Sequence, residues 1–121
     1  MSDSTSDWRD LTVDDAVAVS DFYVAVLGWQ KEALAMGEYN DFIVKDSDGK
    51  VMGGICHRKG PNAEVPTGWL PYFTTRDFDA SVSQVVEQGG KLLSKVREHG
   101  TARFVYVSDP SGAYFALYSE G

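Results

Sequence analysis

The chain has 121 residues, of which 43% are hydrophobic and 12% aromatic, so it is long and apolar enough to bury the core of one domain. Its formal net charge of −7 argues against nucleic acid and membrane surfaces as partners, and it favours a cationic ligand over an anionic one. A single cysteine, Cys56, excludes an internal disulfide and suits a reducing compartment. The first residues are small and polar, unlike a secretory signal, so we expect a cytoplasmic protein with a flexible segment at 1–6.

In chain order, the first half of the sequence reads as a strand, a helix and three more strands. Asp14 or Asp15 is expected to cap the helix, whose apolar residues recur at three- and four-residue steps until Gly28 ends it. Asp48-Gly49 marks a tight turn before the last strand. The expected strands span 8–13, 30–36, 39–45 and 51–57.

The second half repeats this order about 62 residues later. A helix is expected over 78–86, ended by Gly89-Gly90. Asp109-Pro110-Ser111-Gly112 forms a turn like that of Asp46-Ser47-Asp48-Gly49. The expected strands begin at Trp69 and then span 91–96, 103–108 and 113–118. Gly60, Pro61 and Pro66 mark a linker between the halves.

The pattern therefore predicts one domain, 7–121, made of two βαβββ modules (7–57 and 69–121) joined by a linker at 58–68. Neither module alone can cover both faces of its sheet. We expect an α+β fold in which the modules form a curled, mixed eight-stranded sheet with the helices outside. A duplicated unit of this kind usually holds its ligand between the copies.

Several short motifs occur in a characteristic order between Trp8 and Tyr118. They resemble the vicinal oxygen chelate superfamily, which includes glyoxalase I, extradiol dioxygenases and bleomycin-binding proteins, and within it the glyoxalase-related branch. The motifs are Phe22-Tyr23-x-x-Val26-Leu27-Gly28-Trp29, Gly53-Gly54-Ile55, Trp69-Leu70-Pro71-Tyr72-Phe73, Gly89-Gly90-Lys91 and Asp109-Pro110-Ser111-Gly112-Ala113-x-Phe115.

The resemblance implies a divalent metal held by side chains of the first and last strands of each module. The matching positions in this chain are Trp8, Gly53, Leu70 and Ala116. None of these side chains offers the imidazole, thiolate or oxygen donor that such an ion needs. We therefore expect no metal and no other cofactor. His57 does not match the family's pattern and is more often a hydrogen-bonded residue at the rim of a cavity.

Because strand side chains alternate between faces, one set is expected to line the cavity and the other to pack under the helices. Leu11, Val13, Phe73, Phe115 and Leu117 form the expected helix-facing set. The expected cavity-facing set is Trp8, Asp10, Thr12, Val51, Gly53, Ile55, His57, Leu70, Tyr72, Thr74, Tyr114, Ala116 and Tyr118.

Other residues have two interpretations each. Arg103 holds a ligand carboxylate or is a solvated strand end, and Tyr39 and Trp69 close the cleft mouth or lie in a subunit interface. Asp10 acts as a general base, binds a cationic ligand, or only forms a hydrogen bond to a neighbouring strand or faces solvent. The cavity aromatics line a site or fill the space themselves.

Our first hypothesis is a metal-free protein that binds a small aromatic or cationic molecule, as the bleomycin-sequestering members do. The alternative is a lyase- or isomerase-type enzyme that uses Asp10, His57 or a tyrosine for acid–base chemistry without the metal. A third is a scaffold whose cleft is filled. The sequence leaves open whether any reaction is catalysed. The resemblance implies a homodimer, with Trp29 or Trp69 as contacts.

Overall fold

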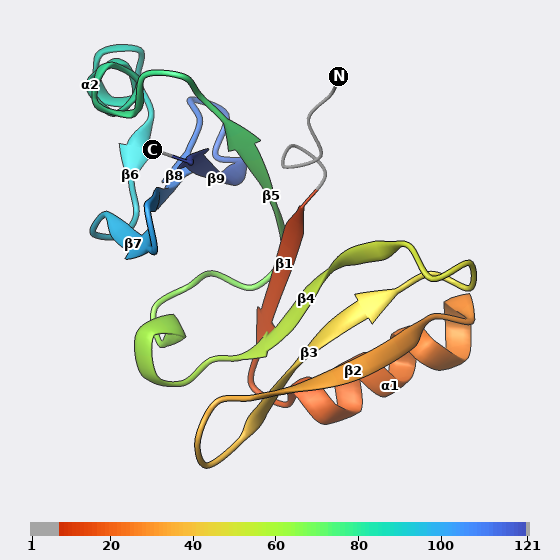
Figure 1. Ribbon diagram of the computed structural model, residues 1–121. Helices are drawn as coiled ribbons and strands as arrows, with labels where there is room; N and C mark the ends of the chain where they lie inside the picture. Colours follow the sequence, from red (N-terminus) through yellow and green to blue (C-terminus); the bar gives the residue numbers. More distant parts are fainter. Residues whose placement is uncertain (1–7, 121) are drawn as a thin grey trace. The chain divides into compact units, whose positions relative to one another are not determined.

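The computed structural model describes residues 8–120, which form two compact units, Trp8–Trp69 (the first unit) and 70–120 (the second unit). Each unit carries one long helix and its own strands, as the duplicated sequence pattern predicts (Figure 1). The segment 1–6, for which we expect flexibility, lies outside the described residues. Within 8–120, no helix is long and apolar enough to cross a membrane.

The first unit is a four-stranded sheet with a helix on one face. Its strands lie in the order β2-β3-β4-β1, with β1 and β4 parallel and the other neighbours antiparallel. A short 3-10 helix, Gly60–Asn62, follows within the expected linker. The elements are β1 Arg9–Val13, α1 Ala16–Leu27, β2 Gln30–Ala35, β3 Asn40–Lys45 and β4 Val51–His57.

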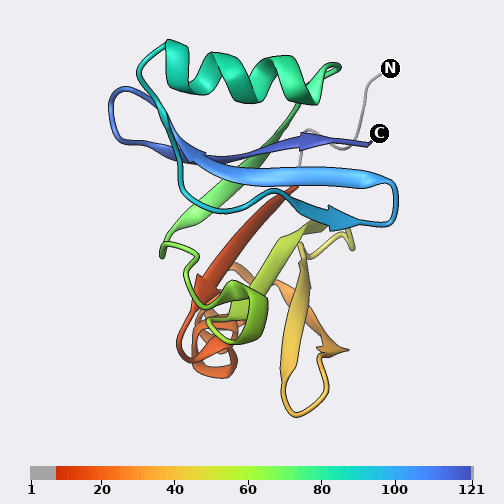
Figure 2. The ribbon, with the colours of Figure 1, turned by 90° about the vertical axis from the view of Figure 1, so that its left-hand side faces the viewer.

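The second unit repeats this arrangement. Its strands lie in the order β5-β9-β8-β6, with β5 and β9 parallel, and β7 also pairs with β8. Figure 2 shows α2 lying along one face of these strands. The elements are β5 Trp69–Thr74, α2 Phe78–Glu87, β6 Lys91–Leu92, β7 Arg97–His99, β8 Ala102–Ser108 and β9 Tyr114–Ser119. The α+β prediction of two βαβββ copies is confirmed.

The described residues hold nine strands rather than the expected eight, because 91–96 is not one strand. The pairing begins as expected, and the Leu93 N–H donates to the Tyr106 carbonyl at 2.8 Å. One step on, the Tyr106 N–H donates to the Ser94 hydroxyl at 3.1 Å instead of to a carbonyl. A side chain thus replaces the backbone acceptor, which interrupts the ladder, and β7 resumes it at Arg97.

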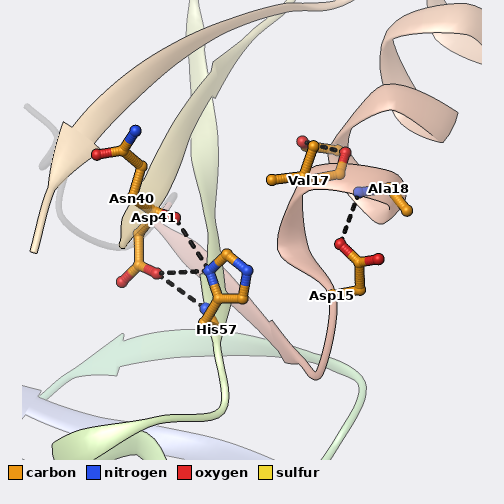
Figure 3. A network of polar contacts seen from close by, with 7 residues as sticks. Asp15, Val17, Ala18, Asn40, Asp41 and His57 are labelled. Atoms are coloured by element: carbon orange, nitrogen blue, oxygen red, sulfur yellow. Dashed lines mark hydrogen bonds and ion pairs between the residues drawn. The ribbon is translucent and has the colours of Figure 1, made fainter. Parts of the chain in front are cut away.

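Both helices begin at an aspartate in the same way. Asp15 Oδ1 accepts from the Ala18 N–H at 3.0 Å (Figure 3), and Asp77 Oδ1 accepts from the Ala80 N–H at 3.1 Å. Asp15 rather than Asp14 is therefore the first cap. Gly28 ends α1 with a left-handed φ of 70°, as expected.

Alternation along the strands separates a core under each helix from the opposite face of each sheet. The expected helix-facing set is confirmed: Leu11 and Val13 pack with α1, Phe115 and Leu117 pack with α2, and the Phe73 ring lies 5.1 Å from that of Phe115. The buried cores comprise Leu11, Ala16, Phe42, Val44 and Ile55 in the first unit, and Phe78, Val105, Val107 and Leu117 in the second.

Candidate functional site

In the first unit, Trp8 and Asp10 meet on the sheet face away from α1. The Trp8 indole Nε1–H donates to Asp10 Oδ1 at 2.9 Å. The β1–β4 register places Gly54 beside Asp10, and a Cβ atom at Gly54 would lie 2.7 Å from Asp10 Oδ1 and 3.5 Å from Trp8 Cζ2. The absent side chain of Gly54 therefore leaves the room that the acid and the indole occupy.

The expectation that Gly53 and Ile55 share the face of Asp10 is wrong for both residues. Gly53 pairs with Val44, which belongs to the core under α1. Ile55 pairs with Leu11 and with Phe42, and all three belong to the core under α1. Counting from the turn before β4, the sequence predicts that Gly53 lies beside Asp10, whereas the residue there is the next one, Gly54.

A β-bulge is the physical reason for this difference. The β3–β4 register shifts at Val44/Lys45, where Val44 pairs with Gly53 but Lys45 pairs with Val51. Met52 is therefore an extra residue, and every later β4 side chain changes face relative to an unbroken strand. Gly53 itself has a φ of 150°, and a Cβ atom there would overlap the Arg9 carbonyl oxygen.

The positions that resemble metal-ligand positions do not fit a divalent ion. In the first unit they are Trp8, whose N–H is used on Asp10, and Gly54 in place of Gly53. In the second unit they are Leu70 and Ala116, which are 2% and 0% exposed. Within 8–120, no three His, Cys, Asp or Glu side chains are grouped so that they could hold a metal.

His57 is a buried, hydrogen-bonded residue. Its Nδ1 lies 3.0 Å from the Asn40 carbonyl oxygen, and since a carbonyl only accepts, Nδ1 carries the hydrogen (Figure 3). Asp41 Oδ1 lies 3.6 Å from the same nitrogen and accepts from the His57 backbone N–H at 2.8 Å. The Tyr39 ring packs edge-on against the imidazole at 5.5 Å, with Lys59 Nζ 5.2 Å from the centre of the Tyr39 ring.

His57 also pairs with Val13, two residues after the Ile55–Leu11 pair, so it lies on the core side of β4 and not in the row of Asp10. The expectation that it faces the cavity is therefore wrong. The bulge at Met52 accounts for this as it does for Ile55.

The second unit presents an aromatic face on the side of its sheet away from α2. We use this name for Tyr72, Phe104, Tyr106 and Tyr118. The Tyr72 ring lies 5.7 Å from that of Phe104, 6.5 Å from that of Tyr106 and 6.1 Å from that of Tyr118. Tyr72 pairs with Ala116 across β5 and β9, as expected for two residues on one face. Tyr114, 44% exposed, lies at the start of β9.

Two arginines lie on opposite sides of this sheet. Arg97 pairs with Phe104, and its guanidinium carbon lies 5.1 Å from the centre of the Phe104 ring and 5.7 Å from that of Tyr106. Arg103 lies on the helix side, where it forms an ion pair with Asp79 at 3.1 Å and lies over the Phe78 ring. The arginine on the aromatic face is therefore Arg97, and Arg103 holds a carboxylate of its own chain on the helix side.

Sequence reasoning did not identify Phe104, Tyr106 or Arg97 as site residues. The first two follow from the period-two alternation of β8, where Phe104 pairs with Tyr118 and Tyr106 with Ala116. Arg97 had no comparable signal, because its strand was expected to end at residue 96. Trp29 and Trp69 both pack around Tyr23, and the Trp69 Nε1–H donates to the Tyr23 hydroxyl at 3.0 Å. Their place in a subunit contact stays a prediction.

Comparison with known proteins gives a family match across most of the chain. A family model described as the Glyoxalase/Bleomycin resistance protein/Dioxygenase superfamily matches residues 5–117. The anthracycline biosynthesis protein DauV of Streptomyces sp. (strain C5) is 31% identical, and DnrV of Streptomyces peucetius is 30% identical. Each alignment covers 94% of this chain but 46% of the relative, so the chain spans about half the length of these relatives.

Two solved structures illustrate the similarity of the fold. A superfamily member from Vibrio splendidus 12B01 has a TM-score of 0.61 at 17% identity, covering 92% of this chain and 95% of that one. Methylmalonyl-CoA epimerase of Streptomyces coelicolor, in complex with 2-nitronate-propionyl-CoA, has a TM-score of 0.57 at 19% identity, covering 93% and 94%. At these identities the likeness concerns the fold.

Proposed function

Because the chain belongs to the Glyoxalase/Bleomycin resistance protein/Dioxygenase superfamily, we propose that it is a metal-free member that binds a small, planar aromatic molecule. The observation that carries the proposal is the aromatic face: four rings from three strands, on the side of the sheet that the helix leaves uncovered. Tilted and edge-on rings that share one face of a sheet favour a flat ligand.

The names of the curated relatives support the same ligand class. Both are called anthracycline biosynthesis proteins, and an anthracycline is built on a planar, fused-ring skeleton. Because this chain corresponds to about half of each relative, the ligand class is what we transfer, not a complete activity. Sequestration of a drug, as in bleomycin resistance, and handling of a biosynthetic intermediate both require this binding step.

The test is a fluorescence titration with pyrenemethanol, a neutral planar probe, on protein that has been dialysed against EDTA. We expect saturable one-to-one binding that EDTA leaves unchanged, and no stoichiometric zinc, nickel, iron or manganese by elemental analysis. Phe104→Ala and Tyr118→Ala should each weaken binding about fivefold to tenfold, because each removes a stacking surface. Val86→Ala, at an exposed position of α2, serves as the control. Tight metal whose removal abolishes binding would contradict the proposal.

A second candidate function is acid–base catalysis by Asp10 without a metal, of the lyase or isomerase type. The specific observation in its favour is the Trp8 indole, which holds the Asp10 carboxylate in one orientation at 2.9 Å. An oriented carboxylate is a suitable general base. The relatives' names, which refer to biosynthesis, also suit an enzyme.

The two candidates separate through Asp10→Asn, assayed on a ligand identified by binding. For an enzyme, this variant should lose turnover by at least about a hundredfold while it still binds the ligand. Trp8→Phe, which keeps an aromatic ring but removes the N–H donor, should reduce turnover by a smaller factor. Unchanged turnover in Asp10→Asn would exclude Asp10 as the base.

We also propose that the protein is a homodimer and that the outer side of α1 supplies the contact. Phe22 and Val26, which lie one turn apart, are 58% and 59% exposed there, whereas the residue of α2 that corresponds to Phe22 is the polar Gln84. The relatives have about twice the length of this chain, which leaves room in them for a second unit of this size. An apolar surface helix face of this kind usually marks an interface.

Sedimentation velocity tests this contact. The double variant Phe22→Ser/Val26→Ser should be a monomer under conditions in which the original chain is a dimer. Val86→Ser serves as the control, because Val86 lies on α2 and is equally exposed at 60%. A monomeric original chain, or a dimeric double variant, would contradict the proposed interface.

A cytoplasmic location and the lack of nucleic acid or membrane partners remain predictions from composition.

A further inference from the structure

A hollow of about 380 Å³ lies at one end of the second unit, where α2 and β8 finish. Figure 2 shows the β8–β9 turn beside the connection from α2 to β6, and a Cβ atom at Gly89 would lie 3.7 Å from Cγ of Pro110. Ligand sites span ~300–1,000 Å³, so the hollow has room for one ring-sized molecule. Its polar side chains include Lys91, Ser108, Asp109 and Tyr114.

Three of these side chains form one row across the strands. Lys91 of β6 pairs with Ser108 of β8, and Ser108 pairs with Tyr114 of β9. The neighbouring residues Val107 and Phe115 pack under α2, so the row lies on the opposite face of the sheet. The strand pairing therefore places an ammonium, an aliphatic hydroxyl and a phenol next to one another.

The side chains of Lys91 and Ser108 have no partner within 8–120, where neither forms a hydrogen bond or an ion pair. Ser108 is only 7% exposed. Since no fully buried polar side-chain atom in that part of the chain lacks a partner, the Ser108 oxygen opens into the hollow. A nearly buried hydroxyl in this situation has its hydrogen bond to offer to a molecule that enters the hollow.

The first unit carries the duplicate of this row with different chemistry. There Gln30 pairs with Lys45, and Lys45 pairs with Val51. Lys45 is ion-paired with Glu32 at 3.1 Å, so its charge is already neutralised. In the second unit a small serine, Ser108, stands in the place of this lysine, which opens the space between the neighbouring strands. The two copies therefore differ at each of the three positions of the row.

Asp109 adds an anionic acceptor to the same hollow. Its Oδ1 accepts from the Ser111 hydroxyl at 2.6 Å and from two backbone N–H groups of the turn, whereas its Oδ2 accepts from no group within 8–120. No ion pair joins Asp109 to Lys91, so the hollow presents the two charges separately. A ligand of one charge is repelled by one of them, whereas a neutral molecule with several hydroxyl groups can accept from Lys91 and donate to Asp109 at once.

We propose that this hollow is a second binding site, for a neutral, ring-shaped polyol such as a monosaccharide unit. The Tyr114 side chain, 44% exposed, offers a flat apolar surface to the C–H face of the ring. Lys91 and Ser108 donate to ligand hydroxyl oxygens, and Asp109 accepts from a ligand hydroxyl.

This site goes beyond the proposed binding function and does not depend on it. Four residues along β8, about 13 Å, separate the row of Ser108 and Tyr114 from the row of Phe104 and Tyr118 on the aromatic face. The two sites can therefore be tested apart.

Saturation-transfer difference NMR on the full chain tests the site with the methyl glycosides of glucose, galactose and mannose as probes. At least one glycoside should show saturable transfer with a dissociation constant of about 1 mM, and acetate and methylammonium, which each carry one charge, should bind more weakly. Lys91→Gln should weaken glycoside binding about fivefold, because a neutral hydrogen bond replaces a charge-assisted one. Ser108→Ala, which removes only the hydroxyl, should weaken it by a similar factor.

Lys95→Gln is the matched control, because Lys95 is an exposed lysine of the same unit that does not line the hollow, and it should leave glycoside binding unchanged. Phe104→Ala should also leave it unchanged, since Phe104 belongs to the aromatic face. Equal weakening by Lys91→Gln and Lys95→Gln would overturn the inference, and so would tighter binding of acetate or methylammonium than of every glycoside. If none of the three glycosides gives saturable transfer, the inference is wrong, while the pyrenemethanol titration still decides the proposed function.

Discussion

Asp109 shows most clearly how one side chain stabilises a whole turn. Its Oδ1 accepts from the Ser111 hydroxyl at 2.6 Å and from the backbone N–H groups of Ser111 and Ala113 at 2.8 and 3.0 Å. These hydrogen bonds, first of all that from the Ser111 hydroxyl, hold the pKa of Asp109 below its ordinary value. Asp46 accepts from Asp48 and Lys50 in the same way, so both copies of the turn use one aspartate as the acceptor.

The lowered pKa of Asp109 predicts how stability depends on pH. A carboxyl whose pKa is lower in the folded protein contributes stability above its unfolded pKa, and this contribution is lost as the pH falls through the folded pKa. Asp109→Asn should therefore lower the melting temperature at neutral pH, and the difference from the original chain should shrink as the buffer becomes acidic. Asp48→Asn, a turn residue whose carboxylate is not the acceptor, is the control. A difference that grows in acid would contradict the prediction.

The two adjacent glycines of β4 predict different costs of substitution. Gly53→Ala should destabilise the protein by more than about 2 kcal/mol in chemical denaturation, because the new Cβ atom would overlap the Arg9 carbonyl oxygen, a backbone atom that cannot easily move. Gly54→Ala should cost less, since its neighbour is the movable Asp10 carboxylate. Gly68→Ala isolates the effect of φ, because Gly68 has a φ of 127° and no atom near the new Cβ. Equal losses in Gly53→Ala and Gly68→Ala would mean that φ and not the overlap with Arg9 sets the cost.

At the scale of elements, the aspartate cap of α2 predicts how substitutions of Asp77 change the free energy of unfolding. Asp77→Ala should destabilise the second unit by about 1 kcal/mol, because the Ala80 N–H loses its acceptor. Asp77→Asn should retain most of the stability, since an amide oxygen accepts equally well at this position. Urea denaturation of both variants checks this. If asparagine costs as much as alanine, the charge of Asp77 and not its hydrogen bond stabilises the helix.

The sequence predicts most elements because hydrophobic periodicity and turn residues are local signals. β4 begins and ends at the predicted residues. The alternation of β5 and β9 correctly places Tyr72 and Phe73 on different faces of the sheet. The bulge at Met52 was not predictable, because it depends on which residues of β3 and β4 pair. The same holds for β7, which exists only as a partner of β8. The candidate site was therefore predicted in type, an aromatic sheet face, but not in its charged residue.

At the scale of the whole molecule, the net charge of −7 predicts how salt affects the proposed dimer. Two protomers of like charge repel each other, and salt screens this repulsion, since the screening length falls from ~30 Å at 0.01 M to ~3 Å at 1 M. An interface formed by apolar α1 side chains should therefore tighten as salt is added. Sedimentation equilibrium at low and high salt measures this. Weaker association at high salt would mean that ion pairs hold the dimer.

The arrangement of Trp8, Asp10 and Gly54 also determines whether a metal-binding side chain could be introduced at this place. A chelating side chain introduced at 54 would meet the Asp10 carboxylate at 2.7 Å from its first carbon, and the Trp8 indole stands beside it. One introduced at 53 would collide with the backbone of β1. Restoring a metal-binding side chain at this edge of the sheet therefore takes at least two substitutions, one that supplies the donor and one that moves Asp10 or Trp8 out of its way.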